Sequence, residues 1–430
     1  MSHTVYVVDG LRSPILKARG RPGSFTASDM AVSVARTILN RQQNIAKEID
    51  EIILGCVMPR ADEANIARLV GLRLDLPQSI PAWTVQRNCA SGMQALDSAM
   101  SQIRLGRSDL VLAGGVEAMS HAPLLFSDSY VNWLADLASA KSFKQKLQVI
   151  TKFRLGLLKP VIGLLCGLTD PTVNMSMGQT AEKIAHRFNI SREDMDNFAM
   201  QSHMRLAQAQ QDNVFADEID PVYDNAGNVN EYDDGVRPDT TMEKLAKLRA
   251  VFDKPFGKVT AGNSAQISDG AAWLLLASEK ALKKYQLKPL AKLTACHWGA
   301  LDPSEMGLGP VYATDALLKE SWLEFKDIDY WEINEAFAGQ VLACLAAFES
   351  EAYCKEFLNA DKAWGAIDQE KLNVHGGAVA CGHPVGMTGA RIVLHLIHLL
   401  RNNNAKKGIA TLCIGGGQGG AMLVEPCNDL

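Results

Sequence analysis

The stretch that decides the fold is CASGMQALDSAMSQIRLGRSDLVLAGGVEAM, residues 89–119. A second stretch with the same pattern is HPVGMTGARIVLHLIHLLRNNNAKKGIATLCIGGGQGGAM, residues 383–422. Each segment opens a helix with a Gly-Met pair, then runs through a polar loop, a strand-like run, a glycine turn and a final Ala-Met. Such an internal repeat predicts two similar α/β units. Cys89 and His383 each lie three residues before the glycine of that pair. Two matching units would therefore place a thiol and an imidazole at corresponding helix starts, facing one site.

Strand-like apolar runs alternate with helical stretches in both halves, as in TVYVVDG (4–10) and EIDEIILGCVM (48–58). This alternation predicts an α/β fold with a mostly buried sheet. The segment between the halves is longer and more polar, and Ser191 with Asp194 is typical of a capped helix start. We therefore predict three parts: an N-terminal half (1–120 plus 251–282), an inserted loop or lid domain (121–250) and a C-terminal half (283–430).

Composition narrows the class of protein. The 430 residues are 47% hydrophobic and 21% charged, and the net charge of -5 gives no indication of nucleic-acid binding. We expect no secretory signal at the N-terminus and no membrane span, because no run of about 18 apolar residues occurs. The nine cysteines show neither a CxxC pair nor zinc-ligand spacing. We expect free thiols in a reducing cytoplasm, and no metal site.

Cys89 stands just before an apolar helical pattern that includes Met93 and Leu96. Asn88 or Ser91 is a plausible cap for that helix. A cysteine at the positive end of a helix dipole has a stabilised thiolate and is nucleophilic. The alternative is a small buried apolar residue, which is what most free cysteines are.

Six motifs resemble the thiolase family from the first strand of the chain to the last. The resemblance is carried by NCASGMQAL (88–96), MGQTAE (177–182), TAGNSAQISDGAA (260–272), NEAFA (334–338), NVHGGAVACGHPVGMTGAR (373–391) and CIGGGQGGAM (413–422). It implies a thiolase fold: two pseudo-symmetric mixed-sheet α/β halves in an αβαβα arrangement, with an inserted lid domain. Coenzyme A would be substrate and product, with no covalently bound cofactor.

The resemblance also implies the catalytic roles. Cys89 carries the acyl group, His383 takes its proton, and Cys413 exchanges the proton on the carbon alpha to the thioester. That last role asks for a thiol whose pKa lies near neutrality. One oxyanion hole combines His383 with a water held by Asn334, and the backbone N–H groups of Cys89 and Gly415 form the other. Taken singly, His383 reads as a turn residue, Cys413 as core and Asn334 as a helix cap.

The coenzyme A contacts rest on weaker matches. The resemblance assigns them to Met177, Arg237 and Ser264, although Ala265 occupies a position where many thiolases have serine. Ser176 stands where some short-chain enzymes have histidine, and His375 is either a neighbour of the site or a turn residue. These departures affect substrate binding and leave the predicted chemistry intact.

The insert contains KSFKQKLQVITKFRLGLLKPVIGLLCGL (141–168), which has no acidic residue. Apolar side chains recur in it every three or four positions from Phe143 to Leu157, which predicts a basic amphipathic helix. It resembles the lid extension in thiolase subunits of β-oxidation complexes. Three roles stay open: binding an anionic membrane, docking on a partner subunit, or packing on its own lid.

We therefore predict a thiolase that cleaves 3-ketoacyl-CoA with CoA through acyl-Cys89 in a ping-pong mechanism. The first alternative is a short-chain acetyltransferase that condenses two acetyl-CoA, since the asparagine of NEAFA is less typical of complex-bound subunits. A ketoacyl synthase would use two histidines and no second active-site cysteine, and a non-catalytic scaffold would have lost the catalytic residues. We expect a homodimer or homotetramer in the cytoplasm, peripheral to the membrane if the insert binds lipid.

Overall fold

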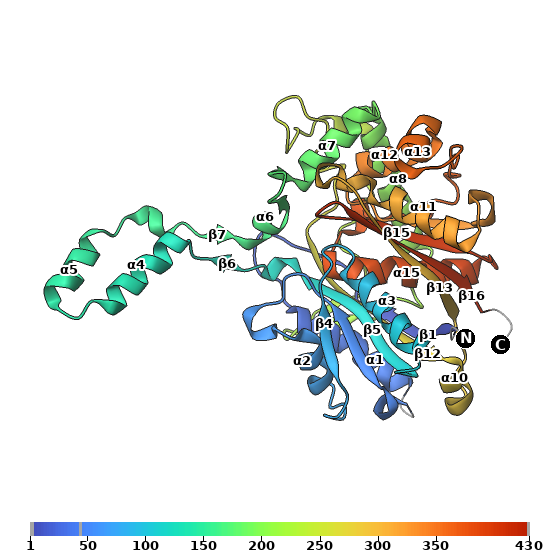
Figure 1. The fold of residues 1–430 in the computed structure, drawn as a ribbon, viewed down its shortest axis with the longest axis horizontal. Coiled ribbons are helices and arrows are strands. Elements are labelled where there is room, and N and C mark those ends of the chain that lie inside the picture. The colour runs from blue at the N-terminus through green and yellow to red at the C-terminus, as the bar shows by residue number, and fades with distance from the viewer. Residues whose placement is uncertain (1–3, 43–44, 428–430) are drawn as a thin grey trace.

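The computed structural model describes residues 4–42 and 45–427 and is built on a ten-stranded mixed sheet with helices on its faces (Figure 1). The strand order is β14 (Tyr330–Ile333), β15 (Gly408–Ile414), β16 (Gln418–Pro426), β13 (Ala291–Ala300), β1 (Val5–Arg12), β12 (Ser268–Ser278), β5 (Leu110–Ala118), β3 (Glu51–Gly55) and β4 (Ala82–Val85), with β2 (Leu16–Lys17) beside β12.

The sheet consists of two halves with the same strand pattern. The order β1-β12-β5-β3 corresponds to β13-β16-β15-β14, and in both series two antiparallel pairings are followed by a parallel one. The halves join where β1 pairs with β13, at Tyr6 with Lys292 and Val7 with Ala291. The two similar units predicted from the repeat are confirmed by this topology.

Helices form three layers around the two halves of the sheet. The middle layer is α3 (Ser91–Arg104) and α15 (Val385–Asn402), which contact each other and strands of both halves. Alternate residues of β5 face opposite layers: Val111 belongs to the central core, whereas Leu112 belongs to the core under the outer helices. The αβαβα layering is thereby confirmed. The outer helices are α1 (Ala27–Arg41), α2 (Ile66–Arg73) and α10 (Glu279–Tyr285) on one side, and α11 (Gly309–Ser321), α12 (Ala338–Glu349) and α13 (Glu351–Leu358) on the other.

Glycines let the two middle helices cross at backbone contact. A Cβ atom added at Gly92 of α3 would lie 2.8 Å from the backbone nitrogen of Ala390, and one added at Gly389 of α15 would lie 2.5 Å from that of Met93. Any larger residue at either position would force the helices apart. The chain segments that lead into both helices are held close together as a result.

The segment between β5 and β12 contains a helical region and small hairpins. Its elements are β8 (Thr169–Asp170), β9 (Met175–Ser176), α7 (Met177–Arg187), α8 (Arg192–Gln211), β10 (Val222–Tyr223), β11 (Val229–Asn230) and α9 (Met242–Ala246). The predicted capping box is confirmed: Asp194 N–H donates to Ser191 Oγ at 3.0 Å, and Ser191 N–H donates to the Asp194 carboxylate at 3.0 Å. The domain limits given above remain a prediction.

An arm projects from the body of the molecule (Figure 1). It consists of the paired strands β6 (Leu124–Leu125) and β7 (Val161–Ile162), with α4 (Asp128–Ser139) and α5 (Phe143–Thr151) between them. The amphipathic helix predicted from Phe143 to Leu157 forms only as far as Thr151, where α5 ends; a 3-10 turn, β7 and the short helix α6 (Gly163–Gly167) follow. Gly156 and Pro160 disfavour a helix interior and account for the absence of an α-helix directly before β7, whereas no such residue stands at Thr151, where α5 ends.

Candidate active site

Cys89 lies on the tight turn between β4 and α3. Asn88 adopts a φ of 43°, a left-handed conformation that asparagine tolerates better than most residues. Its side-chain amide donates to the carbonyl oxygen of Gly415 at 2.8 Å, which ties this turn to the glycine turn after β15. The expected cap at Asn88 or Ser91 is wrong: α3 begins after Ala90 without a side-chain cap, because the Ser91 hydroxyl bonds the backbone of the turn and the Asn88 amide bonds Gly415.

One pocket of about 490 Å³ brings the predicted site residues together. Cys89, His383 and Cys413 line it, although they come from the starts of the two middle helices and from β15. The proposed coenzyme A contacts Met177, Arg237 and Ser264 line the same pocket. Further lining side chains are mostly apolar and include Met119, Leu165, Leu168, Phe252, Met306 and Phe337.

Asn334 contacts His383 but does not itself line this pocket. The amide nitrogen Nδ2 of Asn334 lies 3.5 Å from Nε2 of His383, and both residues are buried. Within the described residues, the amide oxygen of Asn334 is buried without a hydrogen-bond partner. The alternative that Asn334 caps the following helix is wrong, because α12 begins four residues later at Ala338, with Phe337 at its cap position.

Burial raises the pKa of both cysteines that line the pocket, Cys89 and Cys413. Burial raises the pKa of Cys89 to about 11, although hydrogen bonds from the backbone N–H groups of Gly415 and Cys89 partly offset the effect. Burial also raises the pKa of Cys413 well above its usual value. The expected stabilised thiolate at Cys89 and near-neutral thiol at Cys413 are therefore wrong for the unliganded protein, because desolvation outweighs the nearby backbone dipoles.

The imidazole of His383 is uncharged at neutral pH and can therefore act as a base. Burial lowers its pKa to about 3, and the charge of Arg391 acts in the same direction. A neutral imidazole next to a neutral thiol can accept the thiol proton when an acyl group arrives. The two N–H groups that act on the Cys89 sulfur are also placed to donate to an oxygen that develops charge beside it.

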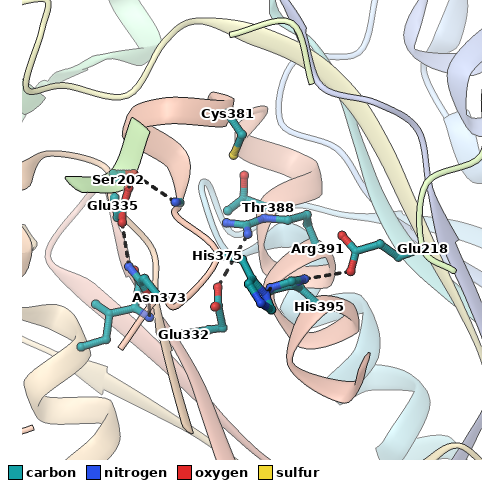
Figure 2. Close-up of polar contacts among 12 residues, drawn as sticks. Ser202, Glu218, Glu332, Glu335, Asn373, His375, Cys381, Thr388, Arg391 and His395 are labelled. Atoms are coloured by element: carbon teal, nitrogen blue, oxygen red, sulfur yellow. Dashed lines mark hydrogen bonds and ion pairs between the residues drawn. The ribbon is translucent and has the colours of Figure 1, made fainter. Parts of the chain in front are cut away.

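Polar side chains clamp the backbone on both sides of Asn334. Asn373 exchanges two hydrogen bonds with the backbone of Ile333, each at 2.9 Å. The carboxylate of Glu335 accepts from Ser202 Oγ at 2.6 Å and from Asn373 Nδ2 at 2.9 Å, as Figure 2 shows. Asn334 is thereby held in register with His383 by partners on both sides.

A buried ionic cluster lies behind this clamp (Figure 2). Arg391 of α15 lies 3.7 Å from Glu332 of β14, and His395 lies 2.8 Å from Glu218. The ring of His375 contacts His395, with 3.1 Å between Nδ1 and Nε2. His375 therefore belongs to this cluster and does not line the active-site pocket.

Two of the proposed coenzyme A contacts make hydrogen bonds within the chain, Ser264 through its hydroxyl and Arg237 through its backbone N–H. Ser264 Oγ donates to the carbonyl oxygen of Thr260 at 2.7 Å, and the backbone N–H of Arg237 donates to His203 Nδ1 at 3.1 Å. Ser176 caps α7 with a capping box and also lines the pocket. Lys17 lies at the same pocket and, with Arg237, adds positive charge there.

Sequence reasoning missed two side chains that support the site. Glu117 accepts hydrogen bonds from the backbone N–H groups of Val57, Met58 and Gly386 at 2.9, 3.0 and 3.1 Å. Thr388 lies with its hydroxyl 2.7 Å from Nδ1 of His383. A carboxylate two residues after the pair Gly114-Gly115, and a hydroxyl five residues after the histidine, were signals that could have found them.

Residues 4–42 and 45–427 contain neither a candidate membrane span nor a candidate metal site. None of the helices there is long and apolar enough to cross a membrane. No group of three or more His, Cys, Asp or Glu side chains in those ranges is arranged to hold a metal ion.

Comparison with known proteins identifies the family of this chain. Residues 5–280 match the thiolase N-terminal domain and residues 287–426 the thiolase C-terminal domain. The beta-ketoadipyl-CoA thiolase of Pseudomonas aeruginosa is 39% identical over 99% of this chain and 100% of its own length. The mitochondrial trifunctional enzyme subunit beta of Bos taurus is 36% identical over 98% of this chain and 88% of its own length.

A solved structure shows the same fold with coenzyme A. Human mitochondrial 3-ketoacyl-CoA thiolase in complex with CoA matches with a TM-score of 0.84 and 36% identity, over 99% of this chain and 98% of that chain. Fold and site together define an enzyme that transfers acyl groups. The chain belongs to the thiolase family, and coenzyme A is a substrate of its reaction.

Proposed function

We propose that this thiolase cleaves 3-ketoacyl-CoA with free CoA in fatty-acid β-oxidation, through an acyl group carried on Cys89. The observation that carries the proposal is the convergence of Cys89, His383 and Cys413 on one largely apolar pocket. Leu165 and Leu168, at the root of the arm, line that pocket and suit an acyl chain. The mitochondrial 3-ketoacyl-CoA thiolase and the trifunctional subunit beta are relatives of comparable length.

The chemistry follows from the protonation states of the three groups. Cys89 gives its proton to His383 Nε2, and the sulfur attacks the 3-keto carbon. The bond between C2 and C3 then breaks, and its electron pair stays on C2, which takes a proton from Cys413 and leaves as acetyl-CoA. The pKa of the buried Cys413 thiol lies well above its usual value, so it keeps this proton until a stronger base, the carbanion, forms.

The second half-reaction restores the enzyme. The Cys413 thiolate takes the proton of the incoming CoA thiol, and the CoA thiolate attacks the acyl group on Cys89. The released Cys89 sulfur recovers its proton from His383. Oxygen charge in both tetrahedral states would be met by the N–H groups of Cys89 and Gly415, and by His383 with an Asn334-held water.

A short-chain acetyltransferase that condenses two acetyl-CoA is the second candidate, because the same steps run in reverse in the same pocket. Thiolysis of acetoacetyl-CoA and of a long-chain 3-ketoacyl-CoA, with wild type and Cys89→Ala, separates the two. Turnover of the long-chain substrate supports the degradative role, whereas activity confined to acetoacetyl-CoA supports the acetyltransferase. A wild type with no acyl transfer on either substrate would leave only a scaffold function.

The arm is proposed to dock the enzyme on an anionic membrane surface or a β-oxidation partner subunit. It exposes a set of large apolar side chains: Leu124, Leu125, Phe126, Val131, Leu134, Phe143, Leu147, Ile150, Leu155, Leu158 and Ile162. Six basic side chains accompany them: Lys141, Lys144, Lys146, Lys152, Arg154 and Lys159. Apolar area combined with positive charge is the chemistry that binds anionic lipid. We further propose a cytoplasmic homodimer or homotetramer, peripheral to the membrane through this arm.

A further inference from the structure

The hydroxyl of Thr388 bridges the catalytic histidine and the start of its helix. Thr388 lies on the first turn of α15 and is buried. Its Oγ1 atom lies 2.7 Å from Nδ1 of His383 and donates to the carbonyl oxygen of Pro384 at 2.9 Å. Figure 2 shows Thr388 on the same helix as Arg391.

This geometry determines which ring nitrogen carries the proton. A hydroxyl has a single proton to donate, and Thr388 directs it to Pro384. Nδ1 of His383 therefore meets lone pairs and must itself be the donor, at 2.7 Å. At the other end of the ring the amide nitrogen of Asn334, which is a donor, lies 3.5 Å from Nε2. Both neighbours thus favour the tautomer with a proton on Nδ1 and a lone pair on Nε2.

Protonation of the His383 ring to the charged imidazolium does not affect this tautomer preference near neutral pH. Burial and the charge of Arg391 lower the pKa of His383 to about 3, so the resting ring is neutral. A neutral imidazole has two tautomers, and only one of them has a lone pair on the nitrogen that faces Asn334. The alternative tautomer would place an N–H there and could not take the Cys89 proton.

We propose that Thr388 is a positioning residue that fixes the tautomer of His383, so that Nε2 serves first as base and then as hydrogen-bond donor. The inference rests on the proposed function. The S–H bond of Cys89 breaks, its electron pair stays on sulfur, and the proton forms a bond with Nε2. The resulting imidazolium keeps its Nδ1–H on Thr388 and presents Nε2–H to the substrate oxygen. One histidine thereby fills both predicted roles, in sequence.

The test compares Thr388→Val, which keeps the shape and removes the hydroxyl, with Thr388→Ser, which keeps the hydroxyl. Thr314→Val on α11 is the matched control, because Thr314 is equally buried and its hydroxyl has no hydrogen-bond partner within the described residues. Two-bond proton–nitrogen correlation spectra of histidine-labelled protein report each tautomer directly. The His383 signal is assigned by its loss in His383→Gln. Circular dichroism checks that every variant folds.

We expect wild type, Thr388→Ser and Thr314→Val to show the Nδ1–H tautomer at His383, and Thr388→Val to show Nε2–H or a mixture. The rate of single-turnover acylation of Cys89 should fall at least about tenfold in Thr388→Val and less than about threefold in Thr388→Ser, with KM for CoA unchanged. A wild-type spectrum with Nε2–H would overturn the proposal without any variant. So would a Thr388→Val enzyme that acylates at the wild-type rate. Failure of the proposed function is distinct, since wild type itself would then transfer no acyl group.

Discussion

The side-chain nitrogen of Asn334 lies 3.5 Å from Nε2 of His383, although the two residues are 49 positions apart and belong to different helix–strand units. His383 precedes α15 of the middle layer, and Asn334 follows β14 at the edge of the sheet. The clamp formed by Asn373 and Glu335 fixes the Asn334 side of the pair, and Thr388 fixes the His383 side. In the proposed mechanism, a substrate oxygen would develop charge between these two side chains.

Replacement of Asn334 by alanine is expected to lower kcat by about 100-fold and to change KM for acyl-CoA by less than about threefold. The reason is that an oxyanion donor acts mainly on the transition state, in which the oxygen carries charge. Steady-state thiolysis of acetoacetyl-CoA measures both constants. A variant with full kcat would show that Asn334 has no part in the oxyanion hole.

Alkylation of Cys89 by iodoacetamide should keep rising with pH to about pH 10. Burial raises the pKa of Cys89 to about 11, so the reactive thiolate fraction grows about tenfold per pH unit below that value. Peptide mapping by mass spectrometry separates Cys89 from the other cysteines. A plateau below pH 8 would instead indicate a preformed thiolate–imidazolium pair with His383.

Replacement of Arg12 by methionine should cost about 3–5 kcal/mol of unfolding free energy, because two buried carboxylates would lose their partner. Arg12 lies 2.7 Å from Glu218 and 2.8 Å from Asp233. Urea unfolding measures the change. Arg41 provides the control, because its exposed side chain lies 3.7 Å from Asp9. Arg41→Met should therefore lower the unfolding free energy by less than about 1 kcal/mol.

The loss of unfolding free energy caused by Arg12→Met should also depend on pH. Burial raises the pKa of Glu218, but the charges of His395 and Arg12 outweigh burial and leave that pKa well below its usual range. A depressed carboxyl pKa adds stability above the unfolded value of about 4.3, and this stability is lost as the pH falls toward the folded value. The difference between wild type and Arg12→Met should therefore be largest above pH 5 and shrink in acid. An equal difference at pH 3 and pH 7 would contradict the assigned charge state.

Removal of the arm should separate docking from catalysis. Joining Leu125 to Val161 by an Asn-Gly turn deletes residues 126–160 and keeps the register of β6 and β7. Acetoacetyl-CoA thiolysis should stay within about twofold of wild type, while flotation with anionic vesicles should be lost. Vesicles of neutral lipid are the control for charge. If the full chain does not float with anionic vesicles, the arm serves a protein partner or the molecule itself.

The repeated halves could be predicted because their signal is local. The Gly-Met pair, the helical spacing after it and the apolar run before the final Ala-Met all follow short-range rules that α3 and α15 obey. The arm could not be predicted in the same way. Apolar spacing continues past Thr151, where the helix actually ends, so periodicity alone extended the helix too far.

The site residues could be placed by motif, but their chemistry depends on the whole fold. Cys89 stands near a helix start, as expected, yet burial by distant segments raises the pKa of its thiol. The hydroxyl of Thr388 reaches Nδ1 of His383 only because the chain turns at Pro384 into the helix. Neither desolvation nor a contact across such a turn leaves a periodic pattern in the sequence.

The most direct measurement of the central claim is the mass of the enzyme after incubation with acetoacetyl-CoA and no free CoA, followed by peptide mapping. One acetyl group is expected on Cys89 in wild type, and addition of CoA should remove it as acetyl-CoA. Cys89→Ser should remain unmodified. Cys413→Ala should become acetylated from acetyl-CoA, yet fail to cleave acetoacetyl-CoA, because it lacks the acid for the departing carbanion. An acetyl group on another residue, or turnover without any acyl-enzyme, would contradict the mechanism.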